Sequence, residues 1–434
     1  MLTNNTIEEA SRKGRPTIWR SIVETYSTRL LLIAIGFTTT VIISRTLGPS
    51  GRGLFAVAAA IGAIGVQFGN FGLHASNTYY VAKDRKLLPV LVGNTLVVSF
   101  GLGGMAALLG WILTAISPKL APLHGTLLAL ALAWIPFGLA YQLLQNLLLG
   151  IDQVRAYNGI ELVSKVIGLI LVGLALLSGR VSAEIMFAAT MAALVISLVW
   201  VLWKLHDFLL RPIFLSLTVF RQHVGLGVKA YLIAFFGFLV MRIDLVMVKY
   251  MLGTQSAGYY SISETMAENM LTLPVVVSTI LFPKLSAMTH NKEKLHLAKK
   301  AAFVTAALMV PIMVMASVLA KPMVQLVFGK SFLPAASPFI LLMPGSFLLG
   351  IETVIVQYLN SLGFPRIIAY AWLLVTALNI GINLWAIPAY GINGAAIVST
   401  ISYSLVFVLV LAVIYQSNRS ERTAVSHDVP QFTT

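Results

Sequence analysis

Long apolar segments separated by short polar links constrain the fold of this chain most strongly. A helix needs about 20 apolar residues to cross the hydrocarbon core of a bilayer. Only 10% of the residues are charged and 58% are hydrophobic, whereas soluble chains carry about 25% charged residues. Lipid offers no partner to unpaired backbone, so each segment should be helical, which predicts an all-α integral membrane protein. Twelve segments meet this description: 22–44, 53–76, 87–116, 124–148, 157–178, 182–205, 224–250, 256–287, 301–320, 336–360, 366–388 and 392–415.

Lysine and arginine are distributed unevenly between the links on the two sides of the predicted membrane. Of the 30 Lys and Arg residues, 19 fall on the side that carries both chain ends and 7 fall on the other. Cytoplasmic loops carry an excess of these residues, so we expect both termini in the cytoplasm. The first apolar segment contains Arg29 and lacks a small-residue cleavage site. It is therefore expected to be a retained span and not a signal peptide.

A turn sequence occurs twice in the chain. SRTLGPSGRGLF (44–55) aligns with KYMLGTQSAGYY (249–260), which places Gly48 over Gly253 and Gly53 over Gly258. A second alignment, at nearly the same shift, places SGRVSAEI (178–185) over YGINGAAI (390–397). The chain is therefore expected to form two six-helix bundles related by an internal repeat, with the substrate site between the halves near the middle of the membrane.

The repeat also sets the predicted domains. They are a cytoplasmic N-terminal segment 1–21, a bundle 22–205, an interfacial linker 206–223, a second bundle 224–415 and a cytoplasmic tail 416–434. The linker mixes charged and apolar residues, as segments that lie along a membrane surface do. The short links leave no room for a soluble catalytic or nucleotide-binding domain.

Several classes of function are disfavoured. GPSGRG lacks the Lys-Ser/Thr ending of a phosphate-binding loop, so we expect no nucleotide partner. The net charge of +15 is expected to reflect anionic lipid and topology, with no nucleic-acid partner. The chain has no cysteine, and its 7 histidines show no metal-ligand spacing. We therefore expect no metal, no cofactor and no enzyme active site.

Basic residues inside spans are candidates for binding an anionic substrate, because intramembrane charges are costly and usually functional. Arg242 is the first candidate and Arg29 the second, since a planar guanidinium suits phosphate; for each, a structural ion pair is the alternative. Lys165 follows Glu161 by four residues, which allows either a self-neutralised pair or a cavity-lining pair. Lys229 completes the predicted cationic set.

Acidic residues inside spans are candidates for ion coupling. Glu264 and Glu268 are four residues apart on one helix face, so their repulsion would favour a proton on one of them. The alternative is ordinary ionisation of both in a water-filled vestibule. Asp244 lies two residues from Arg242, so the two should point in different directions and need separate partners.

Glu24 is the remaining acidic candidate. It occupies the position in the first repeat that Lys229 occupies in the second. The two side chains could approach each other across the central cavity. Alternatively, both could lie at the inner interface and extend towards water.

At this point the motifs indicate a family. LGPSGRGLF, NTYYVAKDRK and the C-terminal run FGKSFLPAASPFILLMPG, YLNSLGFPR and NIGINLWAIPAYGINGAAI resemble the polysaccharide and O-antigen flippases. These belong to the multidrug/oligosaccharidyl-lipid/polysaccharide exporter superfamily. The resemblance covers nearly the whole chain and rests on structural motifs.

The resemblance implies transport without chemistry. Such proteins move undecaprenyl-pyrophosphate-linked oligosaccharides from the inner to the outer leaflet of the bacterial inner membrane, with cationic cavity residues holding the pyrophosphate. Their two bundles would rock in alternating access, driven by an ion gradient without ATP. A polysaccharide polymerase and chain-length or export proteins are implied partners, besides membrane lipids.

Three other functions remain open on the sequence. A multidrug exporter of the same superfamily would favour acidic and aromatic cavity residues, and the spans hold both acidic and basic ones. A membrane-embedded polymerase or glycosyltransferase would need a sizeable loop or an extra domain, which the links do not provide. A non-transporting scaffold of an export complex is the third.

Overall fold

The computed structural model describes residues 18–427, except 118–120, 180, 210–211 and 364. Side chains are described within 31–221 and 231–416, with the same gaps. The side chains of Glu24, Arg29 and Lys229 therefore lie outside the described part. Whether Glu24 approaches Lys229 stays a prediction.

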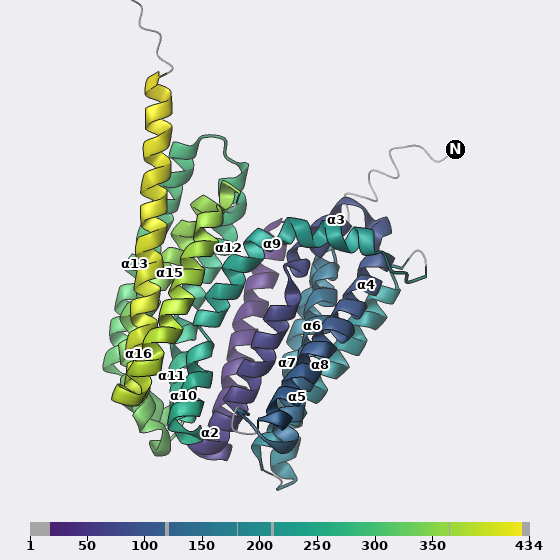
Figure 1. The fold of residues 1–434 in the computed structure, drawn as a ribbon, viewed down its shortest axis with the longest axis vertical. Coiled ribbons are helices and arrows are strands. Elements are labelled where there is room, and N and C mark those ends of the chain that lie inside the picture. The colour runs from purple at the N-terminus through teal and green to yellow at the C-terminus, as the bar shows by residue number, and fades with distance from the viewer. Residues whose placement is uncertain (1–17, 118–120, 180, 210–211, 364, 428–434) are drawn as a thin grey trace, which may run out of the picture.

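The first half of the described chain consists of helices only (Figure 1). It includes a π-helical turn, η2, and a short 3-10 turn, η1. In chain order the elements are α2 (Ile18–Asn70), α3 (Leu73–Lys83), η1 (Arg85–Leu87), α4 (Leu88–Val97), η2 (Val98–Leu102), α5 (Gly103–Ile116), α6 (Gly125–Gly150), α7 (Val154–Leu177) and α8 (Ala183–His206).

The regular elements described in the second half are also all helices, joined by short turns and loops. Its elements are α9 (Leu217–Val240), α10 (Ile243–Leu252), α11 (Thr254–Met270), α12 (Thr272–Ala287), α13 (Asn291–Val318), α14 (Ala320–Val327), the 3-10 turn η4 (Lys330–Ala335), α15 (Ala336–Ser361) and α16 (Arg366–His427).

The twelve predicted segments are mostly helical, with short breaks at 71–72, 241–242, 271 and 319. By length and composition, nine helical stretches of the described chain could cross a membrane, and α11 with α12, bent by 41°, would make a tenth if the pair is one span. Two of the nine, in α2 and α16, each contain two helices that meet at a kinked glycine, Gly48 or Gly391. Figure 1 shows α2 turning back at the end remote from Ile18. The protein is a multi-pass membrane protein with an all-α fold.

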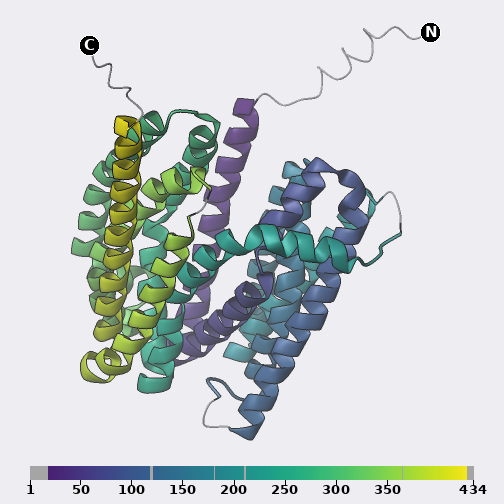
Figure 2. The same cartoon turned by 45° about the horizontal axis from the view of Figure 1, so that its top comes forward.

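The backbone confirms the internal repeat. Gly48 has φ 64° and ψ −178°, and its predicted equivalent Gly253 has φ 87° and ψ 179°. The second alignment pairs Gly179 (φ 70°) with Gly391 (φ 64°). Only glycine adopts these conformations readily, so both alignments place glycine where the fold demands it. Figures 1 and 2 show α2–α8 in one bundle and α10–α16 in the other, with Ile18 and His427 at the same end of the molecule.

The two repeated turns pack directly against each other. A Cβ on Gly53 would collide with the carbonyl oxygen of Thr254 and lie 2.8 Å from the backbone nitrogen of Gly258. A Cβ on Gly258 would collide with the carbonyl oxygen of Pro49 and lie 3.2 Å from the nitrogen of Gly53. The glycines shared by the repeats therefore let the two halves meet backbone to backbone. We call this contact the glycine joint.

Further contacts close the same end of the molecule. The guanidinium of Arg45, in the first half, donates to the carbonyls of Leu326 and Val327 at the end of α14. The largest cluster of buried apolar side chains also joins α2 and α6 to α10, α11 and α15. The halves are thus firmly connected at the end that carries the repeated turns.

A second connection lies near the other end. Helix α9 begins at Leu217, inside the segment 206–223 that we expected to be a linker, and its first turns lie across the end of the first bundle (Figures 1 and 2). The Asn94 side chain donates to the Ser216 carbonyl at 2.9 Å and accepts from its N–H at 3.0 Å. Helix α16 likewise continues to His427, into the expected tail 416–434.

Candidate functional site

Three adjoining cavities lie within and between the halves. The central cavity, of about 490 Å³, is bordered by Arg52, Lys165, Arg242, Glu264 and Glu268, and so draws on both halves. The N-half cavity, of about 520 Å³, lies mainly between α2, α6, α7 and α8. The C-half cavity, of about 790 Å³, lies mainly between α9, α12 and α15. All three border Phe238.

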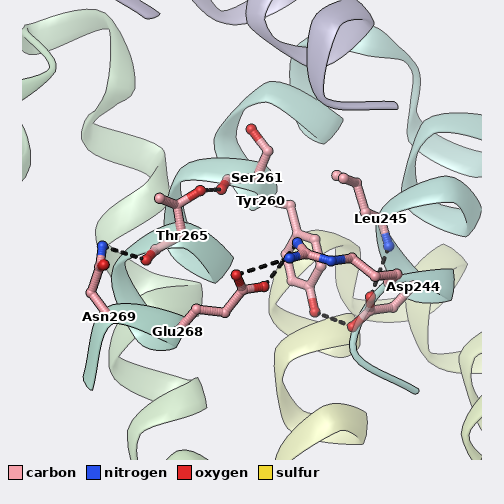
Figure 3. Close-up of polar contacts among 8 residues, drawn as sticks. Asp244, Leu245, Tyr260, Ser261, Thr265, Glu268 and Asn269 are labelled. Atoms are coloured by element: carbon pink, nitrogen blue, oxygen red, sulfur yellow. Dashed lines mark hydrogen bonds and ion pairs between the residues drawn. The ribbon is translucent and has the colours of Figure 1, made fainter. Parts of the chain in front are cut away.

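Arg242 stands at the break between α9 and α10, where the backbone leaves the helical region. Its guanidinium makes a bidentate ion pair with Glu268 of α11, with Nη1–Oε1 at 2.8 Å and Nη2–Oε2 at 3.0 Å (Figure 3). The two side chains are 31% and 30% exposed, and both border the central and C-half cavities. Arg242 is therefore ion-paired and also borders cavities that a ligand could enter. The structural ion pair and the substrate-binding role that we considered as alternatives are thus compatible.

Asp244 points away from this pair, as the two-residue spacing predicted. Its carboxylate accepts hydrogen bonds from the Tyr260 hydroxyl at 2.6 Å and the Leu245 N–H at 2.9 Å (Figure 3). It also accepts one from the Ser399 hydroxyl at 2.7 Å. The side chain is 1% exposed. Asp244 thus ties α10, α11 and α16 together inside the second half.

The two glutamates of α11 have different surroundings. Glu268 is bound to Arg242, whereas Glu264 is buried one turn earlier on α11. The Oε1 atom of Glu264 has no protein partner within the described structure. Whether Glu264 and Glu268 repel each other enough to favour a proton on one of them stays a prediction. Burial of Glu264 differs from the water-filled vestibule that we considered.

Lys165 and Glu161 both line cavities. Both border the N-half cavity; Lys165 also reaches the central cavity and Glu161 the C-half cavity. Among the described residues, no ion pair within 4.0 Å joins the two side chains. This arrangement favours the cavity-lining interpretation over a self-neutralised pair.

Arg52 is a site residue that the sequence reasoning missed. We placed it in the link between two spans, but the chain returns to helix at Pro49, so Arg52 lies within the second helix of α2. It is 7% exposed, borders the central and N-half cavities, and its guanidinium lies 5.7 Å from the centre of the Phe55 ring. Its Nε has no hydrogen-bond partner in the described part of the chain.

One sequence signal could have identified Arg52. The glycines of the turn recur in the second repeat, but Ala257 occupies the position equivalent to Arg52. A charge present in only one copy of a structural repeat is not needed for the turn itself. Within the described residues, no cluster of three or more candidate metal ligands occurs.

Comparison with known proteins identifies the family. The model of a family described as "Polysaccharide biosynthesis protein" matches residues 42–337. The chain belongs to this family. It is also 25% identical over 241 residues to a probable low-salt glycan biosynthesis flippase, Agl15, of Haloferax volcanii. That match covers 55% of this chain, and the chain spans about half the length of this relative (50%).

Several solved structures share the fold of this chain although their sequence identity to it is low. The lipid II flippase MurJ in an inward closed conformation matches with a TM-score of 0.72 at 15% identity, covering 91% of this chain and 87% of MurJ. The multidrug transporter DinF-BH matches with 0.64 at 15% identity, covering 90% and 92%. An inward-facing MATE family transporter matches with 0.62 at 14%, covering 92% and 96%. These likenesses confirm the fold.

Proposed function

We propose that the protein is a flippase that moves lipid-linked oligosaccharide from the inner to the outer leaflet of the bacterial inner membrane, with both termini in the cytoplasm. The observation that carries this proposal is Arg52, a buried arginine that borders the cavity between the two halves and whose Nε has no hydrogen-bond partner among the described residues. A buried charged group needs a partner, and an anionic ligand would supply one. The family and the name of the Haloferax relative support a glycan-linked substrate.

The central cavity suits a pyrophosphate. Arg52 and Lys165 reach it from the first half and Arg242 from the second. Guanidinium groups bind phosphate oxygens through paired, charge-assisted hydrogen bonds, and Lys adds a compact positive charge. Arg29 and Lys229 remain predicted members of this cationic set.

The C-half cavity suits the first units of a lipid tail. It is lined mainly by apolar side chains of α9, α12 and α15, including Ile233, Leu271 and Val275. It meets the central cavity at Arg242 and Glu268. A lipid pyrophosphate held at Arg242 could therefore place its apolar chain against this surface without leaving the protein.

Ion coupling is proposed to work through the acidic residues of the second half, with Glu24 a further predicted participant. Glu268 and a substrate pyrophosphate would compete for Arg242, because one guanidinium fork cannot serve both fully. The buried Glu264 lies one turn before Glu268 on α11, and Asp244 lies on the neighbouring α10. Arrival of an anion at Arg242 would thus alter the balance of charge and protons around these carboxylates.

The contacts between halves are consistent with alternating access. The glycine joint and Arg45 close one end of the cavity, which is the outer end if the termini are cytoplasmic. Opening that end requires the two repeated turns to separate. A polysaccharide polymerase and chain-length or export proteins are proposed partners, on the family resemblance.

Deleting the gene tests the proposal. Lipid-linked oligosaccharide should accumulate in the inner leaflet of the cytoplasmic membrane, where an enzyme or label added to inside-out vesicles reaches it. Reintroducing the gene should restore the normal distribution. Unchanged glycolipid together with new drug sensitivity would instead indicate a multidrug exporter, whose fold the chain shares.

A further inference from the structure

Neutral amides and aromatic rings line the N-half cavity, in addition to Arg52, Glu161 and Lys165. Gln67 of α2 and Gln142 of α6 are both half-buried and both border it. Within the described structure, neither side-chain amide has a hydrogen-bond partner in the protein. Two amides on a concave wall are therefore available to a ligand.

Small residues leave room in front of these amides. On α2, Ala59, Ala63 and Gln67 follow one another at intervals of four and line the cavity together. On α6, Gly138 precedes Gln142 by the same interval. Residues at this spacing share one helix face. On each helix, small residues thus precede the amide along the cavity wall.

An aromatic ring completes this wall. Trp134 lies one turn before Gly138 on the same face of α6 and borders the cavity. Gly62 and Gly138 pack closely against the Trp134 indole. A Cβ added to Gly62 would lie 2.8 Å from the indole, and a Cβ added to Gly138 would lie 3.1 Å from it. The Phe187 ring lies 5.4 Å from the indole, centroid to centroid. The indole is therefore held in place as a rigid apolar surface.

We infer that the N-half cavity is the glycan subsite, in which Gln67 and Gln142 bind sugar hydroxyls and Trp134 supports the apolar face of a sugar ring. Sugars present neutral donors and acceptors together with apolar C–H faces, and amides and aromatic rings complement both. Arg52 and Lys165 border this cavity and the central one, so a glycan attached to a pyrophosphate held there would enter it directly. This assignment rests on the proposed function.

The length of the wall fits an extended glycan. Arg52 and Gln67 lie on the same helix, fifteen residues apart. At a rise of about 1.5 Å per residue they are separated by about 22 Å along its axis. A chain of several sugars could therefore contact the glutamines while its pyrophosphate remains at Arg52. A site built to bind a substrate hydroxyl also discriminates strongly against analogues that lack it, so these amides would determine which glycan is accepted.

The test compares two probes on the purified full-length protein. Farnesyl pyrophosphate carries the lipid and the pyrophosphate without a glycan, and the second probe is the glycolipid extracted from cells that lack the gene. Gln67→Leu and Gln142→Leu should each weaken glycolipid binding by about 3- to 10-fold, the loss expected for one hydrogen bond. Binding of farnesyl pyrophosphate should remain unchanged, which also shows that the variants are folded.

Gln325→Leu is the matched control, because Gln325 is exposed on α14 and borders none of the three cavities. It should change neither affinity. Equal weakening of both probes by the cavity variants, or no weakening of either, would overturn the glycan subsite while leaving the flippase proposal intact. If neither probe binds the wild-type protein, the proposed function itself fails and the subsite with it.

Discussion

At the scale of single residues, the two arginines of the central cavity have different surroundings. Arg242 is held by the carboxylate of Glu268 through two hydrogen bonds. Arg52 is more deeply buried, and its Nε has no partner in the described structure. An anionic ligand at Arg242 would have to displace the carboxylate of Glu268. At Arg52 no carboxylate of the described structure forms an ion pair that the ligand must displace. Arg52 should therefore contribute most to affinity, and Arg242 should link binding to the acidic residues.

Arg52→Gln tests the first of these roles. The substitution keeps a polar side chain but removes the positive charge and the guanidinium fork. A hydrogen bond to a charged group contributes about 1.5–3 kcal/mol, so farnesyl pyrophosphate should bind roughly 10- to 100-fold more weakly. Isothermal titration of the detergent-solubilised protein measures this change. Lys330→Gln, at the exposed first residue of η4, is the control, and an equal loss in both variants would contradict the role of Arg52.

Glu268→Gln tests the second role. A neutral amide competes less strongly than a carboxylate for Arg242, so a pyrophosphate should bind more tightly, by about 3- to 10-fold for one weakened charged contact. The same change should make transport insensitive to the ion gradient. Binding and gradient-driven uptake into vesicles would be measured on one preparation. Weaker pyrophosphate binding in this variant would show that Glu268 does not compete for Arg242.

The sequence predicted part of this residue-scale arrangement. It identified Arg242 and Glu268 as intramembrane charges, and the helical period correctly separated Arg242 from Asp244. It did not pair Arg242 with Glu268, because they lie 26 residues apart on different helices and only tertiary packing brings them together. Arg52 was missed because the length of the turn, which ends at Pro49, is not visible in the apolar pattern.

At the scale of elements, the repeated turns form the contact that must open during transport. Each turn uses one glycine for its left-handed bend, Gly48 or Gly253, and another for close approach, Gly53 or Gly258. The first pair shapes each hairpin separately. The second pair makes the glycine joint between halves, so a side chain there would affect the closed state of the cavity and not the hairpin alone.

Gly53→Ala and Gly258→Ala should each disfavour closure of the joint, because the added methyl group would collide with backbone of the opposite turn. The chain has no cysteine, so Thr40→Cys provides a unique reporter that borders the N-half and central cavities. In right-side-out vesicles, a membrane-impermeant maleimide should label this cysteine several-fold faster in the alanine variants.

Gly36→Ala is the control for this experiment. Gly36 lies on α2 and borders the same cavities, but an added Cβ would have nothing within 4 Å. Its labelling rate should match that of the Thr40→Cys protein with native glycines. Equal rates in all three glycine variants would indicate that the glycine joint does not control access.

Elements were more predictable than contacts. The apolar segments and the repeated glycines predicted the helices and their pairing into two halves, since span length and turn conformation are local properties. The start of α9 was not predicted, because its first turns carry mixed side chains and depend on the contact between Asn94 and Ser216. The bend between α11 and α12 was likewise hidden within one apolar segment.

At the scale of the whole molecule, three cavities of different chemistry meet between two related bundles. We propose that they correspond to the three parts of a lipid-linked oligosaccharide: glycan in the N-half cavity, pyrophosphate in the central cavity and lipid in the C-half cavity. Such a substrate must carry a polar head group across a membrane while its tail stays in an apolar environment. A cavity that is cationic in the middle and apolar on one side meets both requirements.

Reconstitution tests this account most directly. Purified protein would be placed in liposomes containing a fluorescent lipid-linked oligosaccharide, and a membrane-impermeant quencher would report its arrival in the opposite leaflet. The account predicts protein-dependent translocation of the glycolipid that an imposed ion gradient accelerates and that proceeds without ATP. Translocation no faster than in protein-free liposomes, with correctly folded protein and a gradient present, would contradict it.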